Sequence, residues 1–300
     1  MKKHKFSGTG VAVITPFKHD KSIDFDSLAT LIDHLIDKGV SYLVALGTTA
    51  ESVTQTTEEK INIISFFKKR NNSRVPLLVG IGGNNTLQIV NTIQETDFAG
   101  IDGILSVAPF YNKPTQEGIY QHFKTISNAC PVDIVLYNVP GRTSVNITAD
   151  TSLRLARDFA NIVAIKEASG DFDQFTKIAK EKPEGFAVIS GDDNLSVPQL
   201  AAGLDGIISV AANAFTKPFS SMIEAALDGD FSKARQIHFD LFDLYTSLFI
   251  EGNPAGVKAA LNILGIVENE LRLPLVPVSS EIYELIEDQI RKLSKKYTLI

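Results

Sequence analysis

The sequence contains a single cysteine among its 300 residues, so it cannot form an internal disulfide. Cys130 follows Ala129 at the end of an expected helix, and we expect it to be a small buried hydrophobic side chain. The five histidines are scattered without the spacing typical of metal ligands. The chain also lacks a Gly-x-Ser-x-Gly elbow and a P-loop. These absences argue against metal-dependent, serine-hydrolase and P-loop nucleotide chemistry.

The charge and hydropathy patterns give no sign of a nucleic-acid or membrane partner. The formal net charge is −6, and the densest basic cluster, Lys68-Lys69-Arg70, falls at an expected helix end, where cations complement the helix dipole. The apolar stretch 11–17 is interrupted by Thr15 and Pro16, so it is a poor signal peptide and too short to span a membrane. With 44% hydrophobic and 21% charged residues, the composition is typical of a globular protein, which we expect in the cytoplasm.

Short apolar segments rich in Val, Ile and Leu alternate with amphipathic segments along most of the chain. The expected strands cover residues 10–15, 42–46, 77–80, 103–107, 134–137, 162–166, 187–190 and 206–210. The expected helices cover residues 25–38, 57–70, 86–99, 115–128, 148–158, 172–180 and 195–203. Residues suited to helix starts are Asp24, Thr56, Asn85, Pro114, Thr148 and Asp171. Glycines suited to helix ends are Gly39, Gly100 and Gly203.

This alternation predicts an α/β protein with a (β/α)8 TIM barrel, because eight strands separated by helices imply parallel right-handed crossovers. A doubly wound open sheet is the competing architecture. It usually has fewer strands and a glycine fingerprint after the first strand, whereas here the first strand is followed by Pro16-Phe17.

The last part of the chain, from residue 217 onward, is nearly all helical by periodicity. Its clearest helical segments are 231–250, 254–264 and 279–295. Part of this region supplies the eighth barrel helix, and the rest is a small helical extension. We therefore divide the chain into a barrel, 1–230, and a C-terminal helical region, 231–300. No flexible linker separates the two, so we expect the extension to pack on the barrel; its role is not evident from the sequence.

Lys166 is the most informative residue, because it ends the apolar run 161–166. A segment this rich in Ile and Val is typical of a strand buried on both faces. Burial lowers the pKa of a lysine, by up to about 3–5 units when it is complete. A lysine that is neutral near pH 7 attacks carbonyls and forms a Schiff base. The alternative is that Lys166 extends to solvent or pairs with Glu167.

The segments that follow the other expected strands are also rich in candidate binding groups. The turn Gly47-Thr48-Thr49-Ala50-Glu51-Ser52 suits a carboxylate or phosphate, although such a turn also suits a helix cap. Tyr137 ends a strand, and either carries a proton or packs in the core. Arg142 either binds a carboxylate or is a solvated loop residue. The pair Asp192-Asp193 resembles a metal site, but adjacent carboxylates more often cap the next helix.

Three motifs in order resemble the signatures of the dihydrodipicolinate synthase family, a group of pyruvate-dependent class I aldolases related to N-acetylneuraminate lyase. They are Gly-Thr-Thr-Ala-Glu-Ser (47–52), Tyr-Asn-Val-Pro-Gly-Arg-Thr (137–143) and Ile-Lys-Glu-Ala-Ser-Gly (165–170). The resemblance covers essentially the whole chain. It implies the same TIM barrel and the condensation of pyruvate with aspartate semialdehyde in lysine and diaminopimelate biosynthesis. It also implies that no cofactor or metal is needed.

The resemblance also assigns roles to individual residues. Lys166 would form the Schiff base with pyruvate, Tyr137 would be the general acid and base, and Thr48 and Tyr111 would complete a proton relay. Thr49, with Thr48, would hold the pyruvate carboxylate, and the carbonyl of Ile208 would border pyruvate. Arg142 would bind the carboxylate of aspartate semialdehyde. Tyr111 would reach in from a neighbouring subunit of a homotetramer built as a dimer of dimers.

Two alternative functions remain open at this point. The first is a lyase or aldolase that releases pyruvate from a sugar acid, as N-acetylneuraminate lyase does. Arg142 favours the synthase, because the matching position in sialic-acid lyases generally lacks an arginine. The second is a barrel that binds small acids without catalysis, against which the complete set of Lys166, Tyr137, Thr48 and Tyr111 argues. One departure from the family is Ala50, where many members carry glycine.

The resemblance also points to a regulatory site at which lysine-inhibited members bind lysine, with a histidine, a glutamate and a tyrosine. Asn84 and Ser52 of that site persist here. The positions that align with the glutamate, the tyrosine and two histidines are Gln88, Phe110, Thr57 and Lys60. Losing the carboxylate removes an ion pair to lysine, and Lys60 adds repulsion, so we expect lysine feedback to be weak or absent.

Overall fold

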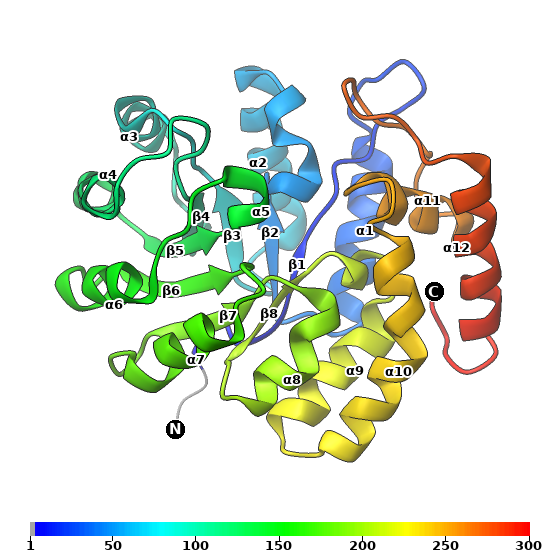
Figure 1. The fold of residues 1–300 in the computed structure, drawn as a ribbon. Helices are drawn as coiled ribbons and strands as arrows, with labels where there is room; N and C mark the ends of the chain where they lie inside the picture. Colours follow the sequence, from blue (N-terminus) through cyan, green and yellow to red (C-terminus); the bar gives the residue numbers. More distant parts are fainter. Residues whose placement is uncertain (1–3) are drawn as a thin grey trace.

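The computed structural model describes residues 4–300 and contains a closed barrel of eight parallel strands in the order β1 to β8 (Figure 1). This confirms the predicted TIM barrel. The strands are β1 (Gly8–Ala12), β2 (Tyr42–Ala45), β3 (Leu77–Gly80), β4 (Gly103–Val107), β5 (Asp133–Asn138), β6 (Ile162–Glu167), β7 (Ala187–Ser190) and β8 (Gly206–Ser209). The first strand starts two residues and ends three residues earlier than predicted, because β1 pairs with β8 from Gly8 to Val11 and β8 ends at Ser209.

Helices form the outer layer around these strands (Figure 1). They are α1 (Phe25–Asp37), α2 (Thr57–Asn71), α3 (Thr86–Glu95), α4 (Gln116–Ala129), α6 (Ala149–Asp158), α7 (Phe172–Glu181), α8 (Ser196–Ala201) and α9 (Thr216–Leu227). The helix predicted over 86–99 is too long, because the backbone turns extended at Thr96 (φ −84°, ψ 128°). The short helix α5 (Pro140–Thr143), which follows β5, was not predicted.

The predicted helix starts agree with the observed N-caps in all but one case. A side-chain oxygen accepts a hydrogen bond from a backbone N–H in the first turn at Asp24, Thr56, Asn85, Thr148 and Asp171. At α4 the cap is Thr115 and not Pro114. Gly39 and Gly203 follow the C-caps of α1 and α8 with positive φ, as predicted, whereas Gly100 also has a positive φ but lies beyond the end of α3 at Glu95, so its prediction as a helix end is wrong. Cys130 caps the end of α4 and is buried, as expected.

The barrel interior is filled by side chains at the end where the strands begin. Phe6 precedes β1 and packs edge-on against Tyr42, with ring centroids 5.6 Å apart. The Tyr42 hydroxyl donates to the carbonyl of Ile207 at 3.2 Å. Gly10 makes room for this ring, because a Cβ there would lie 2.2 Å from Tyr42 Cε2. Polar chemistry is therefore confined to the opposite end, where the strands finish.

The C-terminal helices α10 (Phe231–Ser247), α11 (Ala255–Ile263) and α12 (Ser280–Leu293) pack together on one side of the barrel (Figure 1). α10 packs against α9, and α12 packs against both α10 and α11. The division of the chain after residue 230 stays a prediction. Within residues 4–300, no helix has the length and apolar character needed to cross a membrane.

The C-terminal region is tied to the barrel by an ion pair whose contribution to stability depends on pH. Arg272 donates from Nη1 and Nη2 to the Glu59 carboxylate at 2.8 and 2.5 Å. These hydrogen bonds lower the pKa of Glu59 to about 2. A carboxyl with a depressed folded-state pKa stabilises the fold above its unfolded pKa, and that contribution is lost as the pH falls through the folded value.

We predict that Glu59→Gln lowers the free energy of unfolding by about 2 kcal/mol at pH 7. The difference from the wild type should shrink as the pH falls from 4.5 towards 2, because Glu59 then becomes protonated in the folded wild type. Urea unfolding across this range measures it. Glu58→Gln, at the exposed neighbouring position in α2, is the matched control. A difference that stays constant down to pH 2 would contradict the prediction.

Candidate active site

Lys166 and Tyr137 lie side by side at the carboxyl ends of two paired strands. They are register partners in the β5–β6 ladder, and Lys166 Nζ lies 4.4 Å from the centroid of the Tyr137 ring. Both are buried, with 4% and 7% of their surface exposed. Lys166 therefore does not extend to solvent. It does not pair with Glu167 either, since successive strand residues point to opposite faces and no such ion pair forms within residues 4–300.

Glu167, on the other face of β6, holds the two strands in this register. Its carboxylate accepts hydrogen bonds from Asn138 Nδ2 at 3.1 and 3.0 Å, from the Ser169 N–H at 2.8 Å and from Gln174 Nε2 at 2.9 Å. Burial raises the pKa of Glu167, while these hydrogen bonds oppose the rise. Because Asn138 follows Tyr137 and Glu167 follows Lys166, this network fixes the spacing of the two inward-facing side chains.

A glycine keeps the space beside Lys166 open. Gly191 follows β7, and its N–H donates to the Glu167 carbonyl at 2.7 Å. A Cβ at this position would lie 2.5 Å from the Ala168 Cβ and 3.1 Å from Lys166 Cε. Any larger residue here would have to displace the loop or the lysine.

The two acidic residues that follow Gly191 differ in their surroundings. Asp193 Oδ2 accepts from the N–H groups of Val210 and Ala211 at 3.2 and 2.8 Å, so it orders the turn after β8. The prediction that this pair caps the next helix is wrong, because no side chain accepts a hydrogen bond at the start of the 3-10 helix Asp193–Leu195 or of α8. Burial raises the pKa of Asp192 to about 6, against the opposing charge of Lys166. Within residues 4–300, no group of three or more His, Cys, Asp or Glu side chains could hold a metal ion.

The turn after β2 carries the two candidate threonines in a short 3-10 helix, Thr48–Ala50. Thr49 is buried, and its Oγ1 accepts a hydrogen bond from Asn253 Nδ2 at 2.9 Å, whereas Thr48 is exposed. The left-handed residue of this turn is Glu51 (φ 55°, ψ 34°). Ala50 is not left-handed, so alanine in place of the family's usual glycine carries no backbone penalty here.

The remaining candidate residues lie at the same end of the barrel. Ile208, near the end of β8, is fully buried in the barrel interior. Arg142 is exposed on α5 and has no ion-pair partner within residues 4–300. Tyr111, in the loop after β4, is 89% exposed with a φ of 73°. No hydrogen bond between described residues joins the hydroxyls of Tyr111, Thr48 and Tyr137.

The surface beside these loops is unusually apolar. Val53, Leu87 and Tyr111 are 90%, 68% and 89% exposed, and Phe110 is 37% exposed. They follow β2, β3 and β4, which are neighbours in the barrel, and Asn84 Nδ2 donates to the Phe110 carbonyl at 3.2 Å.

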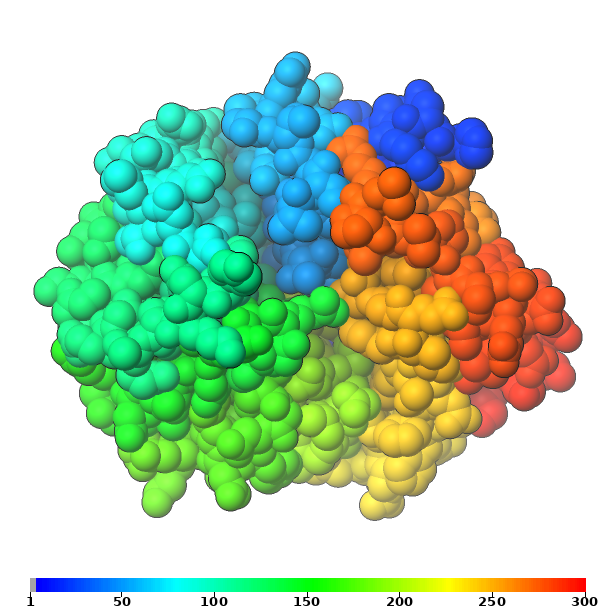
Figure 2. All heavy atoms as spheres, turned by 45° about the horizontal axis from the view of Figure 1, so that its top comes forward, coloured from blue at the N-terminus to red at the C-terminus, as the bar shows by residue number. Residues whose placement is uncertain are grey.

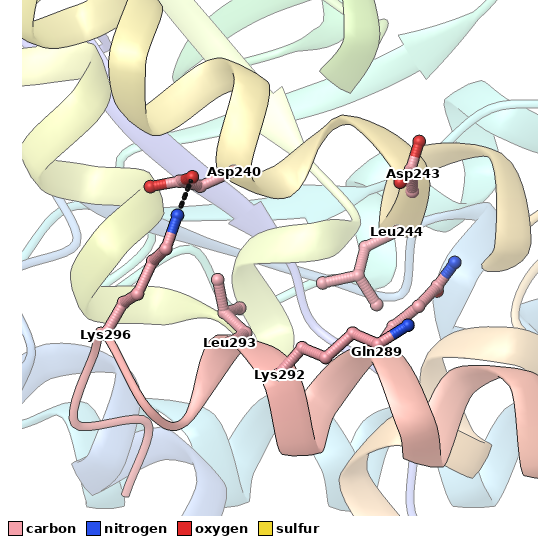
Figure 3. Close-up of a pocket in the computed structure, with 7 residues that line it drawn as sticks. All are labelled: Asp240, Asp243, Leu244, Gln289, Lys292, Leu293 and Lys296. Carbon is pink, nitrogen blue, oxygen red and sulfur yellow. Dashed lines mark hydrogen bonds and ion pairs between the residues drawn. The ribbon is translucent and has the colours of Figure 1, made fainter.

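The strand ends leave a hollow on this face of the molecule. Figure 2 shows it between the blue segment that follows β2 and the green segments that follow β4 and β5. A different pocket, of about 110 Å³, lies between α10 and α12 and is lined by Asp240, Asp243, Leu244, Gln289, Lys292, Leu293 and Lys296 (Figure 3). Its Asp240 already pairs with Lys296 at 2.5 Å, and none of the candidate catalytic residues lines it.

Two residues that contact the candidate turn were missed by the sequence analysis. Asn253 bonds Thr49, and Lys258 in α11 bonds Glu51 with an Nζ–Oε1 distance of 2.5 Å. Lys258 had a signal in the sequence, since it is the single charged residue of the mostly apolar helix Ala255–Ile263. Asn253 had none, because its partner lies 204 residues away.

This chain matches a known protein family over nearly its whole length. The model of the dihydrodipicolinate synthetase family matches residues 5–293. A relative from Parabacteroides distasonis, 4-hydroxy-tetrahydrodipicolinate synthase, is 53% identical over 289 residues, which cover 96% of this chain and 97% of the relative.

Solved structures agree with the sequence comparison. Dihydrodipicolinate synthase from Aquifex aeolicus superposes with a TM-score of 0.93 at 43% identity, over 96% of this chain and 98% of that chain. The chloride-inhibited dihydrodipicolinate synthase from Acinetobacter baumannii, complexed with pyruvate, has a TM-score of 0.93 at 36% identity, over 98% and 99% of the two chains. With the matched family model and the shared fold, this chain belongs to the dihydrodipicolinate synthetase family.

Proposed function

We propose that this chain condenses pyruvate with L-aspartate 4-semialdehyde through a Schiff base on Lys166, as a 4-hydroxy-tetrahydrodipicolinate synthase in lysine and diaminopimelate biosynthesis. The observation that carries the proposal is the buried lysine at the end of β6, with Tyr137 beside it. The name of the Parabacteroides distasonis relative and the pyruvate complex of the Acinetobacter baumannii enzyme support the choice of substrates.

The chemistry follows from the reactivity of a lysine amine. The Lys166 amine adds to the keto carbon of pyruvate, and loss of water leaves an iminium. The iminium withdraws electrons, so the pyruvate methyl group becomes acidic and loses a proton to give an enamine. The enamine carbon then attacks the aldehyde carbon, whose oxygen takes up a proton. Tyr137 would move protons in these steps, a role that the contact between its ring and Lys166 supports.

The surrounding groups would hold the two carboxylates. Thr49, with Thr48, lies on the turn after β2 and would donate hydroxyl hydrogen bonds to the carboxylate of pyruvate. The carbonyl of Ile208 would border the same substrate. Arg142, exposed on α5 after β5, would bind the carboxylate of the semialdehyde through its guanidinium.

Tyr111 would complete the proton relay of a neighbouring subunit, and the enzyme would be a homotetramer built as a dimer of dimers. The apolar surface formed by Val53, Leu87, Phe110 and Tyr111 supports a subunit contact beside the site. An exposed tyrosine with a positive φ is also unusual unless surrounding structure fixes it, which a partner subunit would do.

We predict that borohydride traps a pyruvate adduct on Lys166. Intact mass followed by peptide mapping measures the adduct. Lys258 is the internal control, since it is the other lysine buried among residues 4–300 but is paired with Glu51. Turnover should then require aspartate semialdehyde and not N-acetylmannosamine. An unmodified Lys166 in folded protein would defeat the proposal, and a preference for the sugar-derived aldehyde would favour a lyase.

We predict that Tyr111→Phe lowers kcat by roughly tenfold to a thousandfold, because the hydroxyl is lost from the relay. The melting temperature should stay close to that of the wild type, since the ring remains and the side chain is exposed within its own subunit. Steady-state kinetics and sedimentation at the same protein concentration separate a relay defect from subunit dissociation. An unchanged kcat would remove Tyr111 from the relay.

We predict that millimolar L-lysine leaves the activity unchanged. The positions expected to recognise lysine carry Gln88, Phe110, Thr57 and Lys60, so the ion pair to the lysine amine is lost and a cation is added. Initial rates over a lysine titration, at a pyruvate concentration near its KM, measure the effect. Strong partial inhibition would overturn this prediction.

A further inference from the structure

The turn that carries Thr48 and Thr49 is held in place by residues from the far end of the chain. Asn253, just before α11, donates from Nδ2 to Thr49 Oγ1 at 2.9 Å. Lys258, within α11, bonds Glu51 at 2.5 Å. The partners are 204 and 207 residues apart in sequence. The segment that contains Asn253 and Lys258 therefore holds both ends of the stretch 49–51 in this turn.

The direction of the Asn253 hydrogen bond defines what Thr49 can do. Because the amide nitrogen donates, it occupies an acceptor position of the Thr49 oxygen, and the hydroxyl hydrogen stays free to point elsewhere. Thr49 is 2% exposed and Asn253 is 8% exposed, so little water competes for these groups. A hydroxyl held in this way is a fixed donor for an anion, which is the role that a carboxylate-binding threonine needs.

The ion pair of Glu51 with Lys258 fixes the backbone of Glu51 itself, two residues after Thr49. Glu51 has a left-handed conformation, φ 55° and ψ 34°, which residues other than glycine keep only where the surrounding structure enforces it. Oε1 meets the Lys258 ammonium, and Oε2 accepts from the Arg272 N–H at 3.0 Å. Both carboxylate oxygens are therefore bonded to groups of the C-terminal region.

Lys258 is enclosed on every side. Its Nζ also donates to the Glu270 carbonyl at 2.9 Å and lies 4.2 Å from the centroid of the Phe17 ring. The side chains of Lys258 and Glu51 are both 0% exposed. Burial lowers the pKa of Lys258 to about 8, while the Glu51 charge opposes this effect. With its ammonium bonded and no exposed surface, Lys258 has no access to a keto acid, and its role is to hold Glu51.

We propose that Asn253 and Lys258 are positioning residues for pyruvate binding: Asn253 orients the Thr49 hydroxyl, and Lys258 holds the turn through Glu51. This gives the C-terminal helical region a function in the first half of the reaction. The inference rests on the proposed role of Thr49 and deepens it, since neither positioning residue needs to touch the substrate.

Asn253→Asp is the sharpest test, because it keeps the shape and replaces the donating amide with an acceptor. The Thr49 hydroxyl would then donate to the introduced carboxylate and turn away from the substrate, and a negative charge would lie near the pyruvate carboxylate. We expect kcat/KM for pyruvate to fall about tenfold to a hundredfold, as for loss of a hydrogen bond to a charged group. In a reaction of this ping-pong type, kcat/KM for the semialdehyde should stay within about twofold.

The separation of the two kinetic parameters distinguishes positioning from a general structural defect. A variant that is partly unfolded lowers both parameters in the same proportion, because fewer molecules are active. Asn262→Asp is the matched control, since Asn262 also donates an amide hydrogen bond, in this case to the Val267 carbonyl within the C-terminal region at 2.9 Å. It should leave both parameters unchanged. If Asn253→Asp lowers both parameters equally, or neither, Asn253 has no positioning role.

Lys258 is tested with a pair of substitutions that leaves no buried charge. Lys258→Met alone leaves the Glu51 carboxylate buried and unpaired, which is strongly destabilising. In the double variant Glu51→Gln/Lys258→Met the site is neutral, and the oxygen of the introduced amide can still accept from the Arg272 N–H. We expect this double variant to fold and to lose activity about tenfold in kcat/KM for pyruvate alone. If the folded double variant keeps the wild-type kcat/KM for pyruvate, Lys258 has no positioning role.

Thr49→Val separates failure of this inference from failure of the proposed function. We expect Thr49→Val to lower kcat/KM for pyruvate at least as much as Asn253→Asp does. If Thr49→Val has no effect, the proposed role of Thr49 fails and the positioning role fails with it. If Thr49→Val lowers the parameter and Asn253→Asp does not, Thr49 keeps its role and only the positioning inference is overturned.

Discussion

The parallel pairing of β5 with β6 is the constraint on which the candidate site depends. The ladder aligns Tyr137 with Lys166 and Asn138 with Glu167, so one register sets both the inner and the outer contacts. A shift of one residue would turn Lys166 to the outer face and bring Glu167 inside. The buried Glu167 carboxylate, bonded to Asn138, Ser169 and Gln174, stabilises the correct register, since any other leaves a buried charge without its donors.

A buried lysine and a buried carboxylate on successive residues both cost free energy in a protein interior. The surroundings of Lys166 and Glu167 differ. Glu167 is saturated with hydrogen bonds from three directions, which is the arrangement of a structural group. Lys166 contacts an aromatic ring, with Asp192 as the nearby negative charge, and a glycine leaves space at its side. This difference in surroundings, and not burial alone, separates the candidate nucleophile from Lys258, which is equally buried but saturated by Glu51 and the Glu270 carbonyl.

The sequence was sufficient to predict features that depend on residues close together in the chain. Hydrophobic periodicity gave the eight strands, and the capping residues Asp24, Thr56 and Asp171 marked helix starts to the residue, because both signals act within a few positions. It failed where the backbone leaves a helix without glycine or proline, as at Thr96. It also failed for Asn253, whose bond to Thr49 depends on how the C-terminal helices pack on the barrel. The exposure of Tyr111 could not be read from the sequence either, because it depends on how the loop after β4 is arranged on the folded barrel.

The long sequence separation between the turn after β2 and its partners Asn253 and Lys258 has a consequence for protein synthesis. A ribosome delivers Lys166 and Tyr137 well before it delivers residues 253 and 258, and β8, which closes the barrel against β1, lies between them in the chain. The proposed reactive amine is therefore made before the turn proposed to bind the carboxylate has its anchors. On these proposed roles, substrate recognition is completed last, when the C-terminal helices dock, so an incomplete chain released early would carry the lysine without the contacts that select its acid substrate.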